Sequence, residues 1–360
     1  MKLKKNIKLL IILAILGFGI YKGINLYKNI DNSISKETKS LMQENNISKD
    51  NYSKTLEYVL LNNIYDEKYL DEYKNIEFVD NSNFEEIITT FLPKGYSGKE
   101  INYLMKISGK NISYLKDMDY IDISKYYEFK NFDASKYERY EAYLKDNEYD
   151  LKDVVTYVNI NLDLKPYTDT LEVDDPNSLN VLVNKYNYLP NGYSPSDLIY
   201  LDGAYGNKVP VREILKDDFL KLQKTAKEEI GINLMPTTAY RNFSFQTTLY
   251  NNYVASDGKE KADTYSARPG YSEHQTGLAI DLRNTVLPSN IRLTDENFDW
   301  LLNNAYKFGF IIRFPKEKEF ITGYQFENWH IRYVGESTAK IIYENNLTLE
   351  EYIDLYVKEY

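Results

Sequence analysis

The sequence predicts an α+β protein in which a mostly helical region precedes a domain with a small antiparallel sheet flanked by helices. Three observations support this prediction. Residues 31–170 show apolar residues at helical spacing, separated by Asn, Asp and Gly, and residues after 178 add short apolar runs typical of strands. Asp174–Ser178 has the composition of a linker, and a chain of 360 residues has room for two domains.

The amino end has the layout of an export signal. Four lysines between residues 2 and 8 precede an apolar run over residues 9–20, and no small-x-small cleavage site follows. We therefore expect residues 1–28 to form an uncleaved signal anchor that crosses the cytoplasmic membrane once. The rest of the chain is then expected on the extracellular face of the cell membrane.

Residues 29–171 are predicted to form a helical stalk or adaptor domain. Phe84, Ile87, Ile88 and Phe91 follow the spacing of one helix face, and Pro93 ends that helix. Further along, Ser97 and Glu100 form a capping box that predicts the start of another helix.

Residues 172–360 are predicted to form the mixed domain. A helix is expected from Thr294 to Lys307, ended by Gly309, and Thr348 with Glu351 predicts a final short helix. The runs expected as strands are Val181–Val183, Leu278–Leu282, Phe310–Phe314 and Trp329–Val334.

Composition excludes several classes of function. The formal charge of -10 and the pI near 5.0 make nucleic acid a poor partner, because an acidic surface repels phosphate. The chain has no cysteine, which excludes thiolate metal sites, a cysteine nucleophile and a lipidated cysteine anchor. Any metal must therefore be bound by His, Asp or Glu.

The chain contains only 2 histidines, His274 and His330, and both lie in dense polar clusters of the second domain. Near the first, Asp281 interrupts an apolar strand-like run, where a buried carboxylate needs a cation or a metal. Near the second, Glu327 precedes His330 by three positions. Two imidazoles and one carboxylate form a standard ligand set for catalytic zinc, which leaves Glu327 free to act as general base.

The alternative for Asp281 is a salt bridge to an arginine such as Arg283 or Arg313.

Spacing also sets conditions on a metal site. Residues seven apart on a strand face opposite sides, so His274 must precede the strand in a bend that Gly277 permits. Glu327 and His330 are three positions apart and would also face opposite sides of a strand, so Glu327 is expected in a turn rather than in register with His330.

These clusters belong to a longer pattern. Residues 265–277 read Tyr-Ser-Ala-Arg-Pro-Gly-Tyr-Ser-Glu-His-Gln-Thr-Gly, Asp281 follows, and residues 327–330 read Glu-Asn-Trp-His. This pattern closely resembles the zinc D-alanyl-D-alanine carboxypeptidases of the vancomycin-resistance type. The resemblance continues through residues 306–315 and 319–324 and covers roughly residues 177–357, about half of the chain.

The resemblance implies a role for each matching residue. The metal ligands are expected to be His274, Asp281 and His330, binding Zn²⁺, with Glu327 as the catalytic base. A Tyr-Arg pair followed by a glutamine is also part of the family pattern and matches Tyr240, Arg241 and Gln246 here. Arg241 is then expected to bind the terminal carboxylate of the substrate, because a planar guanidinium can grip a carboxylate with two hydrogen bonds. Gln246 and Ser266 are expected to hydrogen-bond the peptide.

The expected function is that of a zinc metallocarboxypeptidase that removes the terminal D-alanine from peptidoglycan stem peptides ending in D-Ala-D-Ala. The motif excludes the serine-type enzymes of the same activity. An L,D-carboxypeptidase or a peptidoglycan endopeptidase could use the same site with a different peptide register. A non-catalytic cell-wall-binding protein is a further alternative, although a binding module has no need of Glu327. A third hypothesis makes the helical region a scaffold for proteins of wall synthesis.

Overall fold

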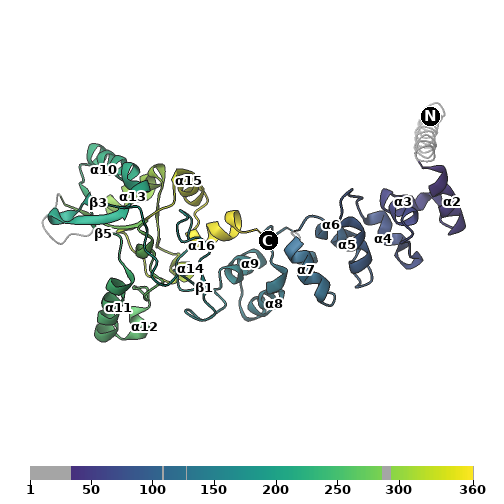
Figure 1. Cartoon of the computed structure of the whole chain (residues 1–360), viewed down its shortest axis with the longest axis horizontal. Coiled ribbons are helices and arrows are strands. Elements are labelled where there is room, and N and C mark those ends of the chain that lie inside the picture. Colours follow the sequence, from purple (N-terminus) through teal and green to yellow (C-terminus); the bar gives the residue numbers. More distant parts are fainter. Residues whose placement is uncertain (1–33, 108, 127, 286–292, 360) are drawn as a thin grey trace, which may run out of the picture. The chain divides into compact units, whose positions relative to one another are not determined.

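The computed structural model describes residues 34–359, apart from residues 108, 127 and 286–292. The expected anchor at residues 1–28 lies outside the described residues. Within the described ranges, no helix combines the length and the hydropathy that crossing a bilayer requires. The chain divides into two compact units after residue 128. In Figure 1 the described part of the first unit runs from purple to blue, and the second unit continues through teal and green to yellow.

The described part of the first unit is built from short helices, and three of them begin with a serine cap. Side chains of Ser35, Ser53 and Ser97 accept hydrogen bonds from backbone N–H groups three residues ahead, which satisfies donors that a helix start leaves free. The helices are α2 (Lys36–Glu44), α3 (Lys54–Leu61), α4 (Leu70–Asn75), α5 (Phe84–Phe91), α6 (Gly98–Leu104) and α7 (Gly109–Asp117).

The predicted helix face in this unit is confirmed. Phe84, Ile87, Ile88 and Phe91 of α5 are all buried. The capping box is present as well, because Ser97 accepts from the backbone of Glu100 while the Glu100 side chain accepts from the backbone of Ser97.

The second unit is a mixed helical and sheet domain. Its helices are α8 (Tyr137–Asp146), α9 (Leu151–Asn159), α10 (Lys216–Ile230), α11 (Phe243–Asp257), α12 (Lys259–Ala262), α13 (Asp295–Asn304), α14 (Glu319–Thr322), α15 (Glu336–Glu344) and α16 (Leu349–Tyr352). Its strands are β1 (Leu171–Glu172), β2 (Asn187–Tyr188), β3 (Leu198–Asp202), β4 (Lys208–Arg212), β5 (Leu234–Thr238), β6 (Ala279–Asn284), β7 (Phe310–Ile312) and β8 (His330–Tyr333).

The main sheet is antiparallel and has the strand order β5-β6-β8-β7. Strands β3 and β4 form a separate antiparallel pair, and β1 pairs with β2 in parallel. Along β6, Ile280 and Leu282 belong to the buried core, whereas Asp281 between them points to the other face.

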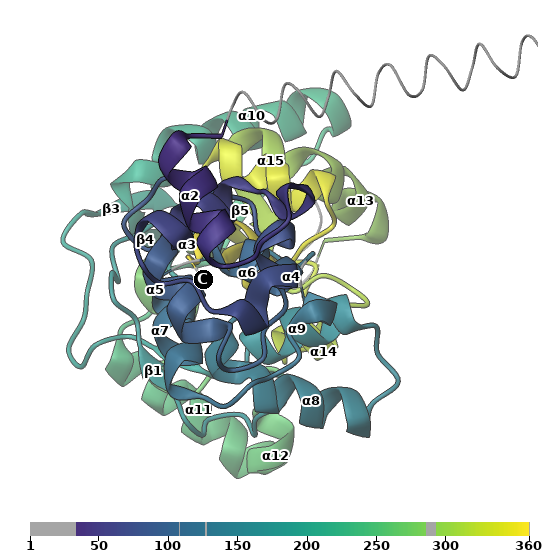
Figure 2. The same ribbon diagram turned by 90° about the vertical axis from the view of Figure 1, so that its right-hand side faces the viewer.

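Helices cover the apolar face of this sheet. Phe219 and Leu222 of α10 and Leu301 of α13 share one buried cluster with Ile280 and Leu282. In Figures 1 and 2, α10 and α15 lie on one side of the second unit, and α11 and α12 lie on the opposite side. One face of the sheet therefore packs against α10, and the polar side chains of the sheet point to the opposite face.

Most of the predicted strands and helices of this domain are present. Strands β7 and β8 fall within their expected runs, and β6 overlaps Leu278–Leu282 but continues to Asn284. The helix expected from Thr294 to Lys307 is present as α13, with Thr294 as its N-cap, followed by a 3₁₀ turn over Ala305–Phe308. The expectation for Val181–Val183 is wrong, because these residues form no strand. Val181 and Val183 are instead buried core residues of an irregular segment, so their apolar character reflects burial rather than sheet pairing.

The compact units do not divide where the linker was expected. Helices α8 and α9 belong to the second unit, so the boundary expected between residues 171 and 172 falls inside it. Two long-range contacts explain this. The Asn131 side chain donates to Asp354 at 2.6 Å, and the ring of Tyr157 on α9 meets Phe320 edge to face at 5.5 Å.

Candidate metal centre

Two of the candidate metal ligands face each other across neighbouring strands. Asp281 of β6 lies directly opposite His330 of β8 in the register of the sheet. Directly opposed residues place their side chains on the same face of a sheet, a few ångströms apart. The distance between His330 Nδ1 and Asp281 Oδ1 is 3.1 Å.

The third candidate ligand comes from a short 3₁₀ helix, Glu273–Thr276, that precedes β6. Gly277 ends this helix with a φ of 71°, in the left-handed region that suits glycine. The turn brings His274 Nε2 to 3.5 Å from Asp281 Oδ1. The bend that the spacing of His274 and Asp281 required before the strand is therefore present, and Glu327 lies just before β8, outside any helix or strand.

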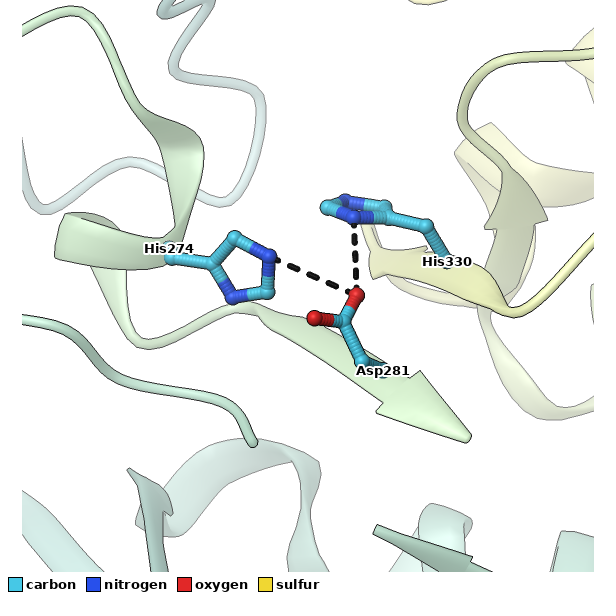
Figure 3. A group of neighbouring side chains, drawn as sticks. All are labelled: His274, Asp281 and His330. Carbon is cyan, nitrogen blue, oxygen red and sulfur yellow. Dashed lines mark ion pairs between the residues drawn. The ribbon is translucent and has the colours of Figure 1, made fainter. Parts of the chain in front are cut away.

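Figure 3 shows the result, in which both imidazole rings point toward the carboxylate of Asp281. One ligand atom from each of His274, Asp281 and His330 lies within 4.8 Å of the others. Tetrahedral zinc with bonds near 2.0–2.2 Å separates neighbouring ligand atoms by roughly 3.4 Å. The separations of 3.1 and 3.5 Å between Asp281 Oδ1 and the two imidazole nitrogens are close to this value. Among the described residues, buried Asp281 Oδ1 has no hydrogen-bond donor. The three residues therefore fit a metal ion.

The other nitrogen of each imidazole is already used. His274 Nδ1 lies 2.7 Å from the backbone oxygen of Ala239, and His330 Nε2 lies 2.7 Å from Glu273 Oε1. These bonds fix the ring orientations and leave Nε2 of His274 and Nδ1 of His330 for a metal.

The charge states of the three ligands suit metal binding in different degrees. Burial and the Arg241 charge lower the pKa of His274 to about 4, so this ring is neutral. Burial opposes ionisation of Asp281, but the two histidines outweigh it and hold its pKa well below the usual value. Burial also opposes protonation of His330, but the neighbouring carboxylates of Asp281 and Glu273 raise its pKa to about 9. A metal must therefore displace a proton from His330 Nδ1.

Asp281 does not form the alternative salt bridge to Arg313. The guanidinium of Arg313 instead donates to Glu273 at 2.7 Å and to both oxygens of Glu350.

Glu327 lies beside the ligands without belonging to them. Its Oε2 is 3.4 Å from His330 Nδ1. Burial raises the pKa of Glu327 to about 7, with Asp281 adding to the rise while His330 and Arg241 reduce it. A carboxyl with a pKa near neutrality beside a candidate metal suits a group that accepts and returns a proton.

The three expected substrate residues lie on the same cavity. The backbone N–H of Arg241 donates to the carbonyl of His274, and Arg241 Nε is buried without a partner among the described residues. Gln246 donates to the Ala267 carbonyl at 2.7 Å, while its Oε1 accepts no hydrogen bond from the described chain. Ser266 is buried and also lines the cavity. Unused polar atoms on Arg241 and Gln246 leave capacity for a ligand.

The cavity has a volume of about 710 Å³ and is lined by all seven candidate residues. Phe314, Tyr324 and Trp329 add aromatic surface to its wall. A cavity of this size with a few convergent polar groups is typical of a small-molecule or peptide site.

Sequence reasoning missed the residues that hold the ligands in place. It named Glu273 as part of a cluster without giving it a role, and it considered Arg313 only as a partner of Asp281. Arg313 and Arg332 are fully buried charges within apolar strand-like runs. Like Asp281, each is a charge inside an apolar strand that needs compensation, so both could have been identified from the sequence in the same way.

Comparisons with known proteins identify a family and several relatives. Residues 208–336 match the family model described as VanY, D-alanyl-D-alanine carboxypeptidase. YodJ of Bacillus subtilis, named as an inferred carboxypeptidase, is 41% identical over 202 residues, which cover 53% of this chain and 73% of the relative.

Two solved structures are also similar. One is the LdcB LD-carboxypeptidase, at 38% identity and a TM-score of 0.48, covering 53% of this chain and 92% of that chain. The other is a vancomycin-resistance D,D-pentapeptidase, VanY, in complex with Zn(II), at 32% identity and a TM-score of 0.43, covering 50% of this chain and 99% of that chain.

Proposed function

The chain belongs to the VanY family of D-alanyl-D-alanine carboxypeptidases, and from this premise we propose that it removes the terminal D-alanine from peptidoglycan stem peptides ending in D-Ala-D-Ala. One observation carries the proposal. Two oriented imidazoles converge on Oδ1 of Asp281, and the carboxyl of Glu327 lies 3.4 Å from one of them.

The proposed cofactor is Zn²⁺, held by His274 Nε2, Asp281 Oδ1 and His330 Nδ1. Two histidines and one carboxylate are a usual donor set for catalytic zinc, and the VanY structure that this chain resembles was solved in complex with Zn(II). When bound, zinc polarises a carbonyl oxygen and lowers the pKa of a water molecule.

Glu327 is proposed as the general base. Its carboxylate takes a proton from the attacking water and then donates that proton to the amine of the departing D-alanine. Its position beside His330 Nδ1 supports this role, because proton and metal chemistry must meet at the same carbonyl group.

Arg241 is proposed to set the register of the peptide. Its guanidinium would bind the terminal carboxylate, so that only the last peptide bond reaches the metal. Gln246 and Ser266, which line the same cavity, would hydrogen-bond the peptide backbone. Recognition of a chain end in this way accounts for exopeptidase specificity.

The proposal is tested by measuring D-alanine release from a muropeptide pentapeptide and from the corresponding tetrapeptide. The assay is run with the untreated protein, with a chelator, and with the chelator followed by zinc. Release from the pentapeptide alone, abolished by chelation and restored by zinc, is the expected result.

Other results would replace the proposal. Release of D-alanine from the tetrapeptide would indicate L,D-carboxypeptidase activity, and cleavage within cross-linked muropeptides would indicate an endopeptidase. Zinc binding without turnover of any of these substrates would favour a cell-wall-binding protein.

We further propose that residues 1–28 anchor the protein in the cytoplasmic membrane as a single pass, with the cavity on the extracellular side. The lysines between residues 2 and 8 and the apolar run over residues 9–20 support this orientation. Protease treatment of intact protoplasts is the test. Degradation of the domain from outside is expected, and full protection would refute the orientation.

A further inference from the structure

A buried carboxylate supports His330 from behind. Glu273 accepts a hydrogen bond from His330 Nε2 at 2.7 Å through Oε1. Its other oxygen, Oε2, accepts from Arg313 Nε at 2.7 Å and from Arg332 at 3.2 Å. Both oxygens of Glu273 are therefore committed, and the orientation of its carboxylate depends on the two arginines.

Arg313 is held in turn by a second buried carboxylate. Its two terminal nitrogens donate to the two oxygens of Glu350 at 3.0 and 2.7 Å, which is a bidentate pair. Asn184 donates to Glu350 at 3.2 Å. Glu350 is 1% exposed, and Arg313 is also 1% exposed, so water does not screen this pair.

The carboxylates and the guanidinium groups behind His330 are equal in number. Glu273 and Glu350 carry two negative charges, and Arg313 and Arg332 carry two positive charges. Buried charges are tolerated only when each is paired and hydrogen-bonded, and loss of one partner leaves the other uncompensated. The position of each member therefore depends on the others.

We propose that Glu350 is a positioning residue of the metal site, which acts through Arg313 and Glu273 on the orientation of His330. This inference rests on the proposed zinc site. Glu350 lies in α16, beyond residues 208–336 that match the family model, and Asn184 lies before them. Support for the metal centre thus comes from segments on both sides of the family match.

Arg313 and His330 both bind the carboxylate of Glu273. If Glu350 loses its charge, Arg313 keeps one carboxylate partner instead of two. The guanidinium is then drawn toward Glu273, whose Oε1 must also hold His330. A weaker or longer bond to His330 Nε2 frees the imidazole to rotate, and Nδ1 no longer has a fixed direction. Loss of such an outer hydrogen bond typically weakens metal affinity by about 10- to 100-fold.

The test is the zinc dissociation constant of the full chain, measured by competition with a chromogenic chelator, together with the visible absorption spectrum of the Co²⁺-substituted protein. Glu350→Gln and Glu273→Gln are each expected to weaken zinc binding about 10- to 100-fold and to shift the Co²⁺ bands. The shared spectral shift would show that both changes reach the same ligand.

Glu351→Gln is the matched control. Glu351 is the neighbour of Glu350 in α16, but its carboxylate bonds to the Thr348 backbone and to Lys318. This variant is expected to lower the melting temperature while zinc affinity stays within about twofold of the unmodified protein. It separates a weaker α16 from a disturbed metal site.

The outcomes are distinct. If the unmodified protein binds no zinc, the proposed metal site itself fails. If the unmodified protein binds zinc and Glu350→Gln binds it equally well, with an unshifted Co²⁺ spectrum, the positioning role is overturned. Should Glu350→Gln fail to fold, Glu350→Asp keeps the charge but shortens its reach, and unchanged zinc affinity in that variant overturns the role equally.

Discussion

Glu327 combines burial with a place beside the metal ligands, and its chemistry follows from that combination. Replacement by Gln keeps the shape and removes the proton acceptor. We expect Glu327→Gln to bind zinc normally and to lose kcat by about 10²- to 10⁴-fold, the usual contribution of a general base. Zinc content and D-alanine release from the pentapeptide measure the two effects separately. Full activity in this variant would refute the assignment.

The pH dependence follows from the same carboxyl group. Its pKa is raised from 4.5 to about 7, and a base must be deprotonated, so kcat/KM should rise as pH increases through this pKa. A bound metal cation stabilises the carboxylate and lowers its pKa. The acidic side of the pH profile is therefore expected to have its midpoint below 7 and toward 4.5. A pH profile of kcat/KM for the zinc-loaded protein is the measurement. A profile that falls with rising pH across this range would contradict the role.

Arg241 can be tested with a substrate pair. We expect Arg241→Ala to raise KM for the pentapeptide, because a charge-assisted contact worth about 1.5–3 kcal/mol is lost, roughly 10- to 100-fold in affinity. A pentapeptide with an amidated carboxyl terminus provides the control. The unmodified protein should strongly prefer the free acid, and the variant should lose that preference. A preference retained in the variant would assign the carboxylate to another residue.

At the residue scale, the candidate metal ligands could be predicted from the sequence. The residues that contact those ligands from behind could not be predicted from it. His274 and His330 could be identified because the chain has only 2 histidines, and Asp281 because it interrupts an apolar strand. Glu273 and Glu350 are separated by 77 positions, and nothing local shows that Arg313 joins them. Their pairing depends on the folded sheet and on α16.

At the scale of elements, the turn before β6 controls where His274 lies. A Cβ at Gly277 would approach Arg212 Cγ at 3.0 Å and Leu198 Cδ2 at 3.2 Å, and its φ is +71°. Gly277→Ala is therefore expected to lower the free energy of unfolding by more than the about 1–2 kcal/mol that a side chain costs in this region. Zinc affinity should fall as well, because this turn carries a ligand.

Gly192→Ala is the matched control for this prediction. Gly192 has a φ of +78°, yet a Cβ there would meet no heavy atom of the described structure within 4 Å. It should show the backbone cost alone, with unchanged zinc affinity. Denaturant unfolding of both variants measures the difference, and equal losses would show that the contacts at Gly277 are unimportant.

Elements with local signals were the ones that could be predicted. The capping boxes at Ser97 and Thr348 and the strands around Asp281 and His330 each follow from neighbouring residues. The strand predicted for Val181–Val183 was wrong, because a short apolar run fits a buried irregular segment as well as a strand. Hydrogen bonding to a neighbouring strand decides between these two structures, and it depends on residues far away in the sequence.

At the scale of the whole molecule, helices α8 and α9 form part of the unit that carries the cavity. Besides the Asn131 and Tyr157 contacts, the Tyr167 ring stacks under the Arg268 guanidinium at 3.8 Å and meets Tyr271, a cavity residue, at 5.1 Å. A fragment of residues 129–360 should therefore melt at a higher temperature than a fragment of residues 172–360. The shorter fragment should also show a higher KM. Equal melting temperatures would place the boundary at the linker after all.

The opposition of Asp281 and His330 has a consequence for the lifetime of the protein. These residues belong to β6 and β8, the central pair of the main sheet, so a metal held by both strands acts as a reversible cross-link. Separating the strands then requires release of the ion, and the resistance of this unit to opening grows with free metal concentration by mass action. A shortage of metal would thus remove the activity of the protein and also expose its chain to proteolysis. The amount of the protein would then follow the supply of metal.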